Sequence, residues 1–153
     1  MSVEQPNFEP IRPGTEADMD RILEIERLSF EKQWYSDDFR SALNELFLVY
    51  QEREVLGFLS ACCCAFAKRA VIMRIAVHPD HRGKGVATKL IAAALDRLKK
   101  ISIEEVELDV EIVKNGAIEL YEKLGFRTRE VITVNGEEEG ECFLEMTLKL
   151  DGE

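Results

Sequence analysis

Two hydrophobic periods alternate along this chain, and the change from one to the other marks the predicted elements. Alternating or unbroken apolar runs are typical of β-strands, and apolar residues three or four positions apart are typical of helices. The strand pattern covers seven segments: 8–12, 47–51, 55–66, 70–77, 106–112, 126–134 and 142–150. The helical pattern covers four segments: 15–29, 36–46, 85–99 and 116–124. This order predicts an α/β fold with a mixed sheet and at least one right-handed crossover.

Polar residues are placed to start the first two predicted helices. Thr15 precedes the first helical segment, and Asp18 three residues later approximates a capping box. Ser36 precedes the short second segment, and its hydroxyl is of the kind that caps helix N-termini. We therefore expect the two helices to begin at Thr15 and Ser36.

The length and composition of the chain are those of a globular protein. Its 153 residues are enough to bury one core, so we expect a single domain over 1–153 with residues 1–7 flexible. The hydrophobic share is 46% and the charged share is 33%, both ordinary values. Because no apolar run has the length of a membrane span and the start lacks a signal-peptide pattern, we expect a cytoplasmic protein without a membrane partner.

The charge of the chain is strongly negative overall but changes sign locally. The formal net charge of −10 argues against nucleic-acid binding as the main activity. Lys and Arg outnumber acidic residues between positions 78 and 100, whereas acidic residues predominate between positions 101 and 123. The first stretch therefore predicts a site for an anion, and the second predicts a site that attracts a cation.

Three of the four cysteines, Cys62, Cys63 and Cys64, are consecutive. Consecutive cysteines lack the C-x-x-C spacing of zinc sites. They are also poor disulfide partners for one another. We therefore expect reduced, small core residues on a strand, and the sequence predicts no metal site.

The segment 72–98 has the clearest chemical pattern of the chain. An apolar run ends at Val77, a basic loop with two glycines follows, and an amphipathic helix begins near Gly85. Free N–H groups at such a helix start, beside a flexible basic turn, are suited to binding phosphate. The alternative is a basic loop at a helix start that binds no ligand.

Two common phosphate-binding motifs fit this loop poorly. A P-loop for nucleoside triphosphates requires a glycine four residues before Gly-Lys-Ser/Thr, which is absent here. Gly83 and Gly85 match the first two glycines of the dinucleotide fingerprint G-x-G-x-x-G, but Thr88 occupies the position of its third glycine. Asp109 stands where a ribose-binding acid is expected, yet the chain is short for a complete doubly wound sheet.

A third motif fits the loop in every position. Arg82, Gly85 and Ala87 match the [QR]-x-x-G-x-[GA] pattern of the acetyl-CoA-dependent GNAT acetyltransferases, and the segment 114–126 closely resembles the N-x-x-A-x-x-L-Y-E-K-L-G-F end of these enzymes. The segment LEIERLSFEKQW at 23–34 resembles, more specifically, the ribosomal-protein-alanine N-acetyltransferases (RimI type). The resemblance implies a single GNAT domain with a mixed, splayed β-sheet flanked by about four helices.

The resemblance also implies the residues that bind the donor, acetyl-CoA, for which no metal is needed. Ile75, Ala76 and Val77 match the strand whose backbone holds the pantetheine arm and the thioester carbonyl. The pyrophosphate loop is matched by Arg82, Gly83, Lys84, Gly85, Val86, Ala87 and Thr88. Asn115 is a further implied cofactor contact, although it stands one residue closer to Tyr121 than in the family pattern.

A strand with alternating acidic residues is the candidate for the acceptor side. Its carboxylates share one face and belong to Glu105, Glu107, Asp109 and Glu111. An ordinary half-exposed strand would show the same alternation. The predicted parallel crossover favours a covered strand instead, so the carboxylates would line a wet acidic cleft that attracts an ammonium group.

The resemblance implies catalytic roles on this side of the reaction. Asp109 takes the position of the glutamate general base, and because its side chain is shorter we expect it to act through a water, with Glu111 as the backup base. Tyr121 matches the general acid that protonates the departing thiolate, the alternative being a core tyrosine. Trp34 and Tyr35 lie where the family has a substrate-shaping loop, although aromatic core packing would also explain them.

These residues together predict acetyl transfer from acetyl-CoA to a primary amine. We expect the N-terminal α-amine of a protein, such as a ribosomal protein, because its pKa of about 8 makes deprotonation easier than for lysine at about 10.4. The alternatives are an acetyltransferase for small amines (a polyamine, an amino acid or an antibiotic-like molecule) and a non-catalytic acyl-CoA-binding module. A monomer and a homodimer are both compatible with the sequence.

Overall fold

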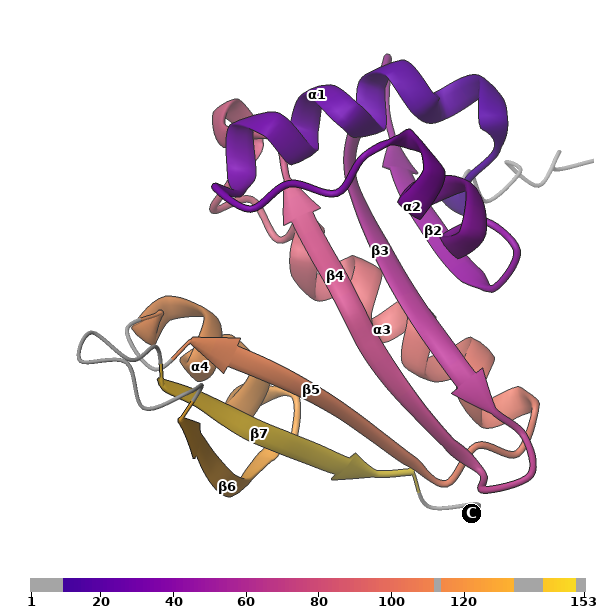
Figure 1. Cartoon of the computed structure of the whole chain (residues 1–153). Coiled ribbons are helices and arrows are strands. Elements are labelled where there is room, and N and C mark those ends of the chain that lie inside the picture. Colours follow the sequence, from indigo (N-terminus) through magenta and orange to yellow (C-terminus); the bar gives the residue numbers. More distant parts are fainter. Residues whose placement is uncertain (1–9, 112–113, 134–141, 151–153) are drawn as a thin grey trace, which may run out of the picture. The chain divides into compact units, whose positions relative to one another are not determined.

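The computed structural model describes residues 10–111, 114–133 and 142–150 of the chain (Figure 1). Its strands are β1 (Ile11–Pro13), β2 (Leu46–Gln51), β3 (Val55–Cys64), β4 (Arg69–Val77), β5 (Glu105–Glu111), β6 (Arg127–Thr133) and β7 (Cys142–Lys149). Its α-helices are α1 (Met19–Ser29), α2 (Ser36–Ala42), α3 (Val86–Lys100) and α4 (Asn115–Lys123). Two single 3₁₀ turns, Glu16–Asp18 and Pro79–His81, precede α1 and α3.

The strands form one mixed sheet in the order β1-β2-β3-β4-β5-β7-β6. β1 pairs antiparallel with β2, and β7 pairs antiparallel with both β5 and β6. β4 and β5 are parallel and α3 connects them, as a βαβ crossover requires. Their ladder runs over three residue pairs, Arg69–Val71 with Glu105–Glu107, and both strands extend beyond it. The predicted α/β class with a mixed sheet is therefore confirmed.

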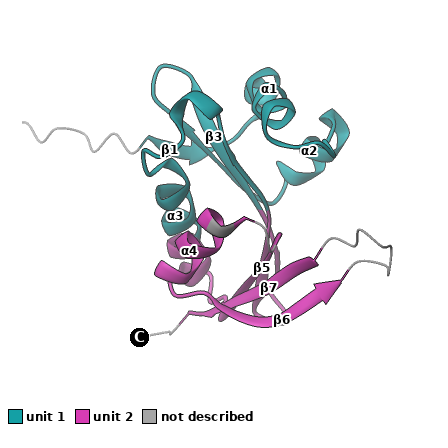
Figure 2. Cartoon of the chain, turned by 90° about the vertical axis from the view of Figure 1, so that its left-hand side faces the viewer, with its two compact units in different colours: residues 1–60, 74–94 teal, residues 61–73, 95–153 magenta. Residues whose placement is uncertain are grey.

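The chain divides into two compact units that share β3, β4 and α3 (Figure 2). Unit 1 contains residues 1–60 and 74–94, and unit 2 contains residues 61–73 and 95–153. The loop before α3 belongs to unit 1, whereas β5 and α4 belong to unit 2. No helix in the described part of the chain is long and apolar enough to cross a membrane.

The core of unit 1 lies between its strands and the pair α1 and α2, which cover one face of those strands while the first half of α3 covers the other (Figure 2). α1 buries Ile22 and Ile25, which are spaced at the helical period. Phe39 of α2 is fully buried, and its ring packs edge-on against Phe58 and Trp34 with ring centroids 5.4 and 5.3 Å apart. These contacts fix α1 and α2 on the strands that precede the basic loop.

Gly57 of β3 allows α3 to pack closely on the other face of unit 1. A Cβ at this glycine would lie 2.9 Å from the backbone oxygen of Ala76 and 3.2 Å from the side chain of Val86. Real Cβ atoms do not approach a backbone oxygen so closely, so any larger residue would displace the start of α3 or the end of β4. Gly57 therefore helps to set where α3 begins.

The core of unit 2 follows the alternation that the sequence predicts. Val106, Leu108 and Val110 of β5 are buried on one face, and Met146 of β7, opposite Leu108, is buried with them. The carboxylates of β5 alternate with these residues and therefore lie on the other face. The apolar face of β5 thus forms the core, and its acidic face is left for other contacts.

Three local predictions need correction. The N-cap of α2 is Tyr35 rather than Ser36, because the Asp38 carboxylate accepts the Tyr35 N–H at 2.8 Å and Ser36 is already helical. α2 ends at Ala42, so the predicted continuation through position 46 is wrong. The consecutive cysteines lie at the end of β3, as predicted, but they are half-buried or exposed rather than core residues. The capping box of Thr15 and Asp18 is confirmed at the 3₁₀ turn.

Candidate active site

The basic loop has two glycines in a left-handed conformation. Gly83 has φ +78° and Gly85 has φ +85°, values that side-chain-bearing residues rarely adopt. A Cβ added at either position would meet no atom within 4 Å. The glycines are therefore required by backbone conformation and not by crowding, and the open space over the loop leaves room for a ligand.

Among the described residues, the start of α3 has N–H groups without a backbone partner, as the sequence predicts. The first intrahelical hydrogen bond runs from Lys89 N–H to the Gly85 carbonyl at 3.0 Å. The N–H groups of Val86, Ala87 and Thr88 therefore precede the helical hydrogen-bond ladder. Together with the positive end of the helix dipole they are suited to an anionic group such as a diphosphate.

The side chain of Arg82 has partners within the protein. Its Nε donates to the Val77 carbonyl at 2.8 Å, and its Nη2 donates to the Ser29 hydroxyl at 3.1 Å. Arg82 therefore connects the loop to the end of β4 and to the end of α1. Lys84 is exposed and offers a second positive charge at the loop.

The last residues of β4 lead directly into this loop. Ile75 is half-buried, and the side chains of Ala76 and Val77 are buried. His78 follows and donates its N–H to the Leu56 carbonyl of β3 at 2.7 Å, which holds the end of β4 against β3. The open glycine loop and the free N–H groups after it fit the diphosphate of acetyl-CoA, and Ile75, Ala76 and Val77 are the strand residues beside it.

The acidic face of β5 is only partly neutralised. Arg69 of β4 forms ion pairs with Glu105, at 3.3 Å, and with Glu107. Glu145 of β7, which stands opposite Asp109, pairs with Arg129 at 3.5 Å. The first two carboxylates of the strand thus share one arginine, and a net negative charge remains on this face.

Asp109, unlike Glu105 and Glu107, has no ion pair with any described residue. Its side chain is exposed, yet partial burial of the carboxyl group, followed by the negative charge of Glu107, raises the pKa of Asp109 above its ordinary value. A higher pKa makes the carboxylate a stronger base. Glu111, the predicted backup base, is half-buried and stands opposite Phe143.

Tyr121 of α4 is buried, with 8% of its surface exposed. Its ring packs edge-on against Phe126 at a centroid distance of 6.0 Å, and its carbonyl accepts the Phe126 N–H. Burial raises the pKa of Tyr121 above its ordinary value, so the phenol stays protonated at neutral pH as a proton donor must. No hydrogen bond of its hydroxyl is present in the described part of the chain, and because no buried side-chain oxygen there lacks a partner, this hydroxyl is open to solvent or to a ligand.

The structure does not join Asp109 and Tyr121 by a hydrogen bond within the described part of unit 2. Asp109 lies on the acidic face of β5. The end of α4 lies on the apolar face, because a Cβ at Gly125 would be 3.1 Å from Leu148, which stands opposite Val106. The Asp109 carboxylate therefore lies on one face of β5, and the end of α4 packs against the other face.

Two further predictions concern Asn115 and metals. Asn115 is the first residue of α4, and its side chain lies outside the described part of the structure. Within the described residues, no group of three His, Cys, Asp or Glu side chains is placed to hold a metal ion.

Sequence reasoning missed a charged pair in unit 1. Glu26 of α1 is fully buried and forms an ion pair with Arg74 of β4. A signal was available, because Glu26 falls on the same helical face as Ile22 and Ile25, and Arg74 interrupts the apolar run of β4. A lone charge on each of two buried surfaces indicates that the two charges meet.

Comparison with known proteins identifies the family. Residues 17–126 match the model of the acetyltransferase (GNAT) family. This match covers more than half of the chain, so the chain belongs to the GNAT family of acetyltransferases. The family and the enzyme class predicted from the loop and from segment 114–126 are thereby confirmed.

Individual relatives agree with this assignment. An uncharacterized N-acetyltransferase of Methanocaldococcus jannaschii is 34% identical over 141 residues, which cover 80% of this chain but 62% of that protein. An N-alpha-acetyltransferase of Sulfurisphaera tokodaii is 28% identical over 137 residues, covering 80% of this chain and 82% of that one. The crystal structure of the ribosomal-protein-S18-alanine N-acetyltransferase from Escherichia coli has a TM-score of 0.81 at 25% identity, covering 94% of this chain and 96% of that chain. The predicted similarity to RimI-type enzymes is confirmed.

Proposed function

We propose that this protein transfers the acetyl group of acetyl-CoA to the N-terminal α-amine of a protein. The observation that best supports binding of acetyl-CoA is the open glycine loop, which is followed by the N–H groups at the start of α3. The similarity to an N-alpha-acetyltransferase and to a ribosomal-protein-alanine N-acetyltransferase supports the acceptor.

The donor is held mainly by backbone groups. The N–H groups of Val86, Ala87 and Thr88 receive the diphosphate, and Lys84 adds a positive charge. The backbone of residues 75–77 holds the arm that leads to the thioester, and Asn115 is a further contact. Acetyl-CoA supplies an activated acyl group, so the protein must bring an uncharged amine to it.

The acidic face of β5 attracts and deprotonates the acceptor amine. An ammonium group is attracted to the carboxylates, and Asp109, whose pKa is raised, accepts its proton through a water. An α-amine with a pKa of about 8 is partly neutral at physiological pH, so a weak base is sufficient. Glu111 is the alternative base, and Tyr121 donates a proton to the departing sulfur.

The experiment that tests this function is a release assay for free CoA with a panel of acceptors. The panel contains peptides with free N-termini, the same peptides with blocked N-termini and an internal lysine, polyamines and single amino acids. We expect turnover with the free N-termini and little with the blocked peptides. Turnover with polyamines or amino acids but not with peptides would refute the proposed acceptor.

A non-catalytic acyl-CoA-binding module makes a different prediction. Such a module would bind acetyl-CoA in calorimetry and release no CoA with any acceptor. Tyr121 favours the enzyme, because its ring is buried while its hydroxyl is not a buried unpaired atom and is therefore open to a ligand.

We also propose that the protein acts in the cytoplasm, where ribosomal proteins are made, as a monomer or a homodimer. Cell fractionation tests the location, and sedimentation at several protein concentrations tests the oligomeric state. Recovery of the protein in an extracytoplasmic fraction would contradict the proposed acceptor class.

A further inference from the structure

Asp109, the candidate base, lies between two other carboxylates of unit 2. Glu107 precedes it by two residues on the same face of β5, a spacing of about 6–7 Å along a strand. Glu145 of β7 stands directly opposite Asp109. Cross-strand neighbours of this kind have Cβ atoms about 4.5–5.5 Å apart, and like charges there repel each other. The arrangement is therefore unfavourable unless other groups balance the charges of Glu107 and Glu145.

Arg69 of β4 balances the charge of Glu107. It stands opposite Glu105 in the parallel ladder of β4 and β5, and it also belongs to unit 2. Its Nε lies 3.3 Å from the Glu105 carboxylate, and its Nη2 donates to the Glu107 carboxylate. One guanidinium group thus contacts both carboxylates, which suits the planar fork of arginine. The Glu107 side chain is thereby held in place, with 21% of its surface exposed.

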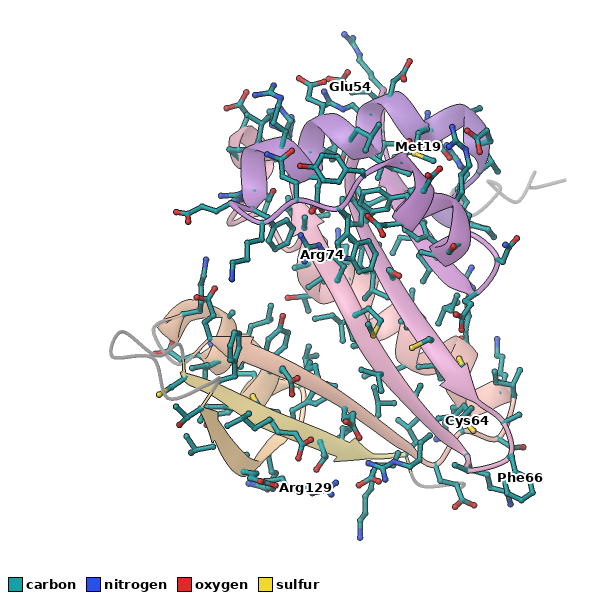
Figure 3. All side chains as sticks on the ribbon, in the orientation of Figure 1. Met19, Glu54, Cys64, Phe66, Arg74 and Arg129 are labelled. Atoms are coloured by element: carbon teal, nitrogen blue, oxygen red, sulfur yellow. The ribbon has the colours of Figure 1, made fainter. Side chains whose placement is uncertain are left out.

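Arg129 of β6 balances the charge of Glu145 at a β-bulge. Thr128 pairs with Met146, but the next residue of β7, Glu145, pairs with Glu130. Arg129 is therefore an extra residue in the ladder, and β-bulges of this kind often lie beside active sites. Its Nε lies 3.5 Å from the Glu145 carboxylate, and Arg129 is labelled on β6 in Figure 3. The bulge thus allows two residues to oppose Glu145, and one of them supplies the balancing charge.

The charges around Asp109 are thus compensated in part. Burial, followed by the charge of Glu107, raises the pKa of Asp109 above its ordinary value. A general base must be ionised at the working pH and as strong as that condition allows. Both conditions depend on the charges that share its face, which over the described parts of β4 to β7 belong to Arg69, Glu105, Glu107, Glu111, Arg127, Arg129, Glu130, Glu145 and Lys149.

We propose that Arg69 and Arg129 are positioning residues that hold Glu107 and Glu145 beside Asp109 and thereby set the strength of this base. The inference rests on the proposed acetyl transfer and adds the groups that control its base. Without either arginine, an unbalanced carboxylate favours the protonated form of Asp109. A protonated carboxyl group cannot accept the proton of the amine, so the variant loses its base at a higher pH than the unchanged protein does.

The first test is a titration of Asp109 followed by NMR, which needs no substrate. The aspartate carboxyl carbons are isotope-labelled, and the Asp109 signal is the one missing from the Asp109→Asn variant. In Arg69→Met and in Arg129→Met the midpoint of this titration should rise by about 0.5 pH unit or more, as one charge at about 7 Å produces near a protein surface. Both variants should fold, because exposed ion pairs contribute little stability. An unchanged midpoint in either variant would overturn the role of that arginine.

A double variant tests whether Arg69 acts through Glu107. Arg69→Met/Glu107→Gln removes one positive and one negative charge, so the Asp109 midpoint should fall back from its value in Arg69→Met. Glu105 also loses its partner, but it lies about 13 Å from Asp109 along the strand, where salt screens its charge. A double variant that keeps the raised midpoint of Arg69→Met contradicts the proposed action through Glu107.

The second test measures the pH dependence of kcat in the CoA-release assay, with saturating acetyl-CoA and acceptor peptide. In Arg69→Met and in Arg129→Met the acid limb should move to higher pH, and kcat at high pH should stay within about twofold. A purely structural role would lower kcat at every pH and leave the limb in place, and that result refutes the proposal. A raised NMR midpoint with an unmoved limb shows that Asp109 is not the base and refutes it as well.

Arg97 of α3 provides a matched control in unit 2. It lies on a helix and has no ion pair with any described residue. Arg97→Met removes the same charge by the same substitution, and it should change neither the Asp109 midpoint nor the acid limb. If Arg97→Met raises the midpoint as Arg69→Met does, the effect is a general loss of positive charge and the proposal fails. Absence of turnover by the unchanged protein would refute the proposed function, and with it the role of Asp109 as a base, even where the NMR midpoints move as expected.

Discussion

Replacing Gly85 by alanine isolates the contribution of backbone conformation to the donor site. Gly85 has φ +85°, and a Cβ there would meet no atom within 4 Å, so the substitution introduces no clash. The remaining penalty is that of a side-chain-bearing residue in the left-handed region, about 1–2 kcal/mol. The protein can accept this strain, which lowers stability, or relax the loop, which moves the N–H groups that precede α3.

The two responses can be measured separately. Strain that is retained should lower the Tm by about 2–8 °C, given about 2–4 °C per kcal/mol for a chain of this size. Relaxation should weaken acetyl-CoA binding by about five- to thirtyfold, since each 1.4 kcal/mol is a factor of ten. Scanning calorimetry gives the first quantity and titration calorimetry with acetyl-CoA gives the second, and their sum should approach about 1–2 kcal/mol.

Gly116 provides the matched control. It lies in α4, its φ is not positive, and a Cβ there also meets no atom within 4 Å. Gly116→Ala should therefore leave the affinity unchanged and stabilise the protein by up to about 1 kcal/mol, because alanine favours helices over glycine. If Gly85→Ala behaves like Gly116→Ala in both measurements, the left-handed conformation is not needed for the donor site and the reasoning is wrong.

Three further substitutions test other parts of the site. Tyr121→Phe should lower kcat by about 100-fold or more while the Tm changes little, because the ring and its packing on Phe126 remain and no described hydrogen bond is lost; unchanged turnover would exclude Tyr121 as the acid. The raised pKa of Asp109 means that its ionised form destabilises the folded state above that pKa, and that this cost vanishes as the pH falls below the ordinary value of 3.8. Asp109→Asn should therefore raise the Tm at pH 7, have no effect on it near pH 3, and lower kcat/KM; a Tm difference that is larger at pH 3 would contradict the sign of the shift. Gly57→Ala should destabilise the protein by about 1–3 kcal/mol in urea unfolding, because its Cβ would lie 2.9 Å from the Ala76 oxygen; a neutral result would mean that β3 and β4 separate easily.

The parts of the fold that could be predicted depend on local periodicity. The alternation of β5 correctly separates its buried residues from its carboxylates, because side chains of a strand alternate between faces whatever lies around them. The glycine loop was located for a similar reason, since its pattern is contained in a few consecutive residues. The capping preference of serine is a weaker signal, and at α2 the reciprocal bond between Tyr35 and Asp38 determines the start instead of Ser36.

The parts that could not be predicted depend on residues far apart in the chain. Arg82 was expected to contribute charge to a phosphate site, and its bonds to Ser29 and Val77 exist only once α1 lies beside the end of β4. The pairing of Glu26 with Arg74 joins positions 48 residues apart. Spacing within the sequence cannot specify such partners, although an isolated charge on a buried face indicates that a partner exists.

The donor site that we propose binds its ligand through main-chain N–H groups, and this has a consequence for mutational surveys. An alanine scan removes side chains and leaves every N–H group in place, so Lys84 and Thr88 should tolerate substitution far better than their position beside the cosubstrate suggests. Proline at position 88 should instead abolish binding, because it removes the backbone N–H group that is proposed to donate to the diphosphate. Side-chain identity at Lys84 and Thr88 is therefore weakly constrained, in contrast to the two glycines with positive φ, and a variability profile of the loop would understate how much of it contacts the cosubstrate.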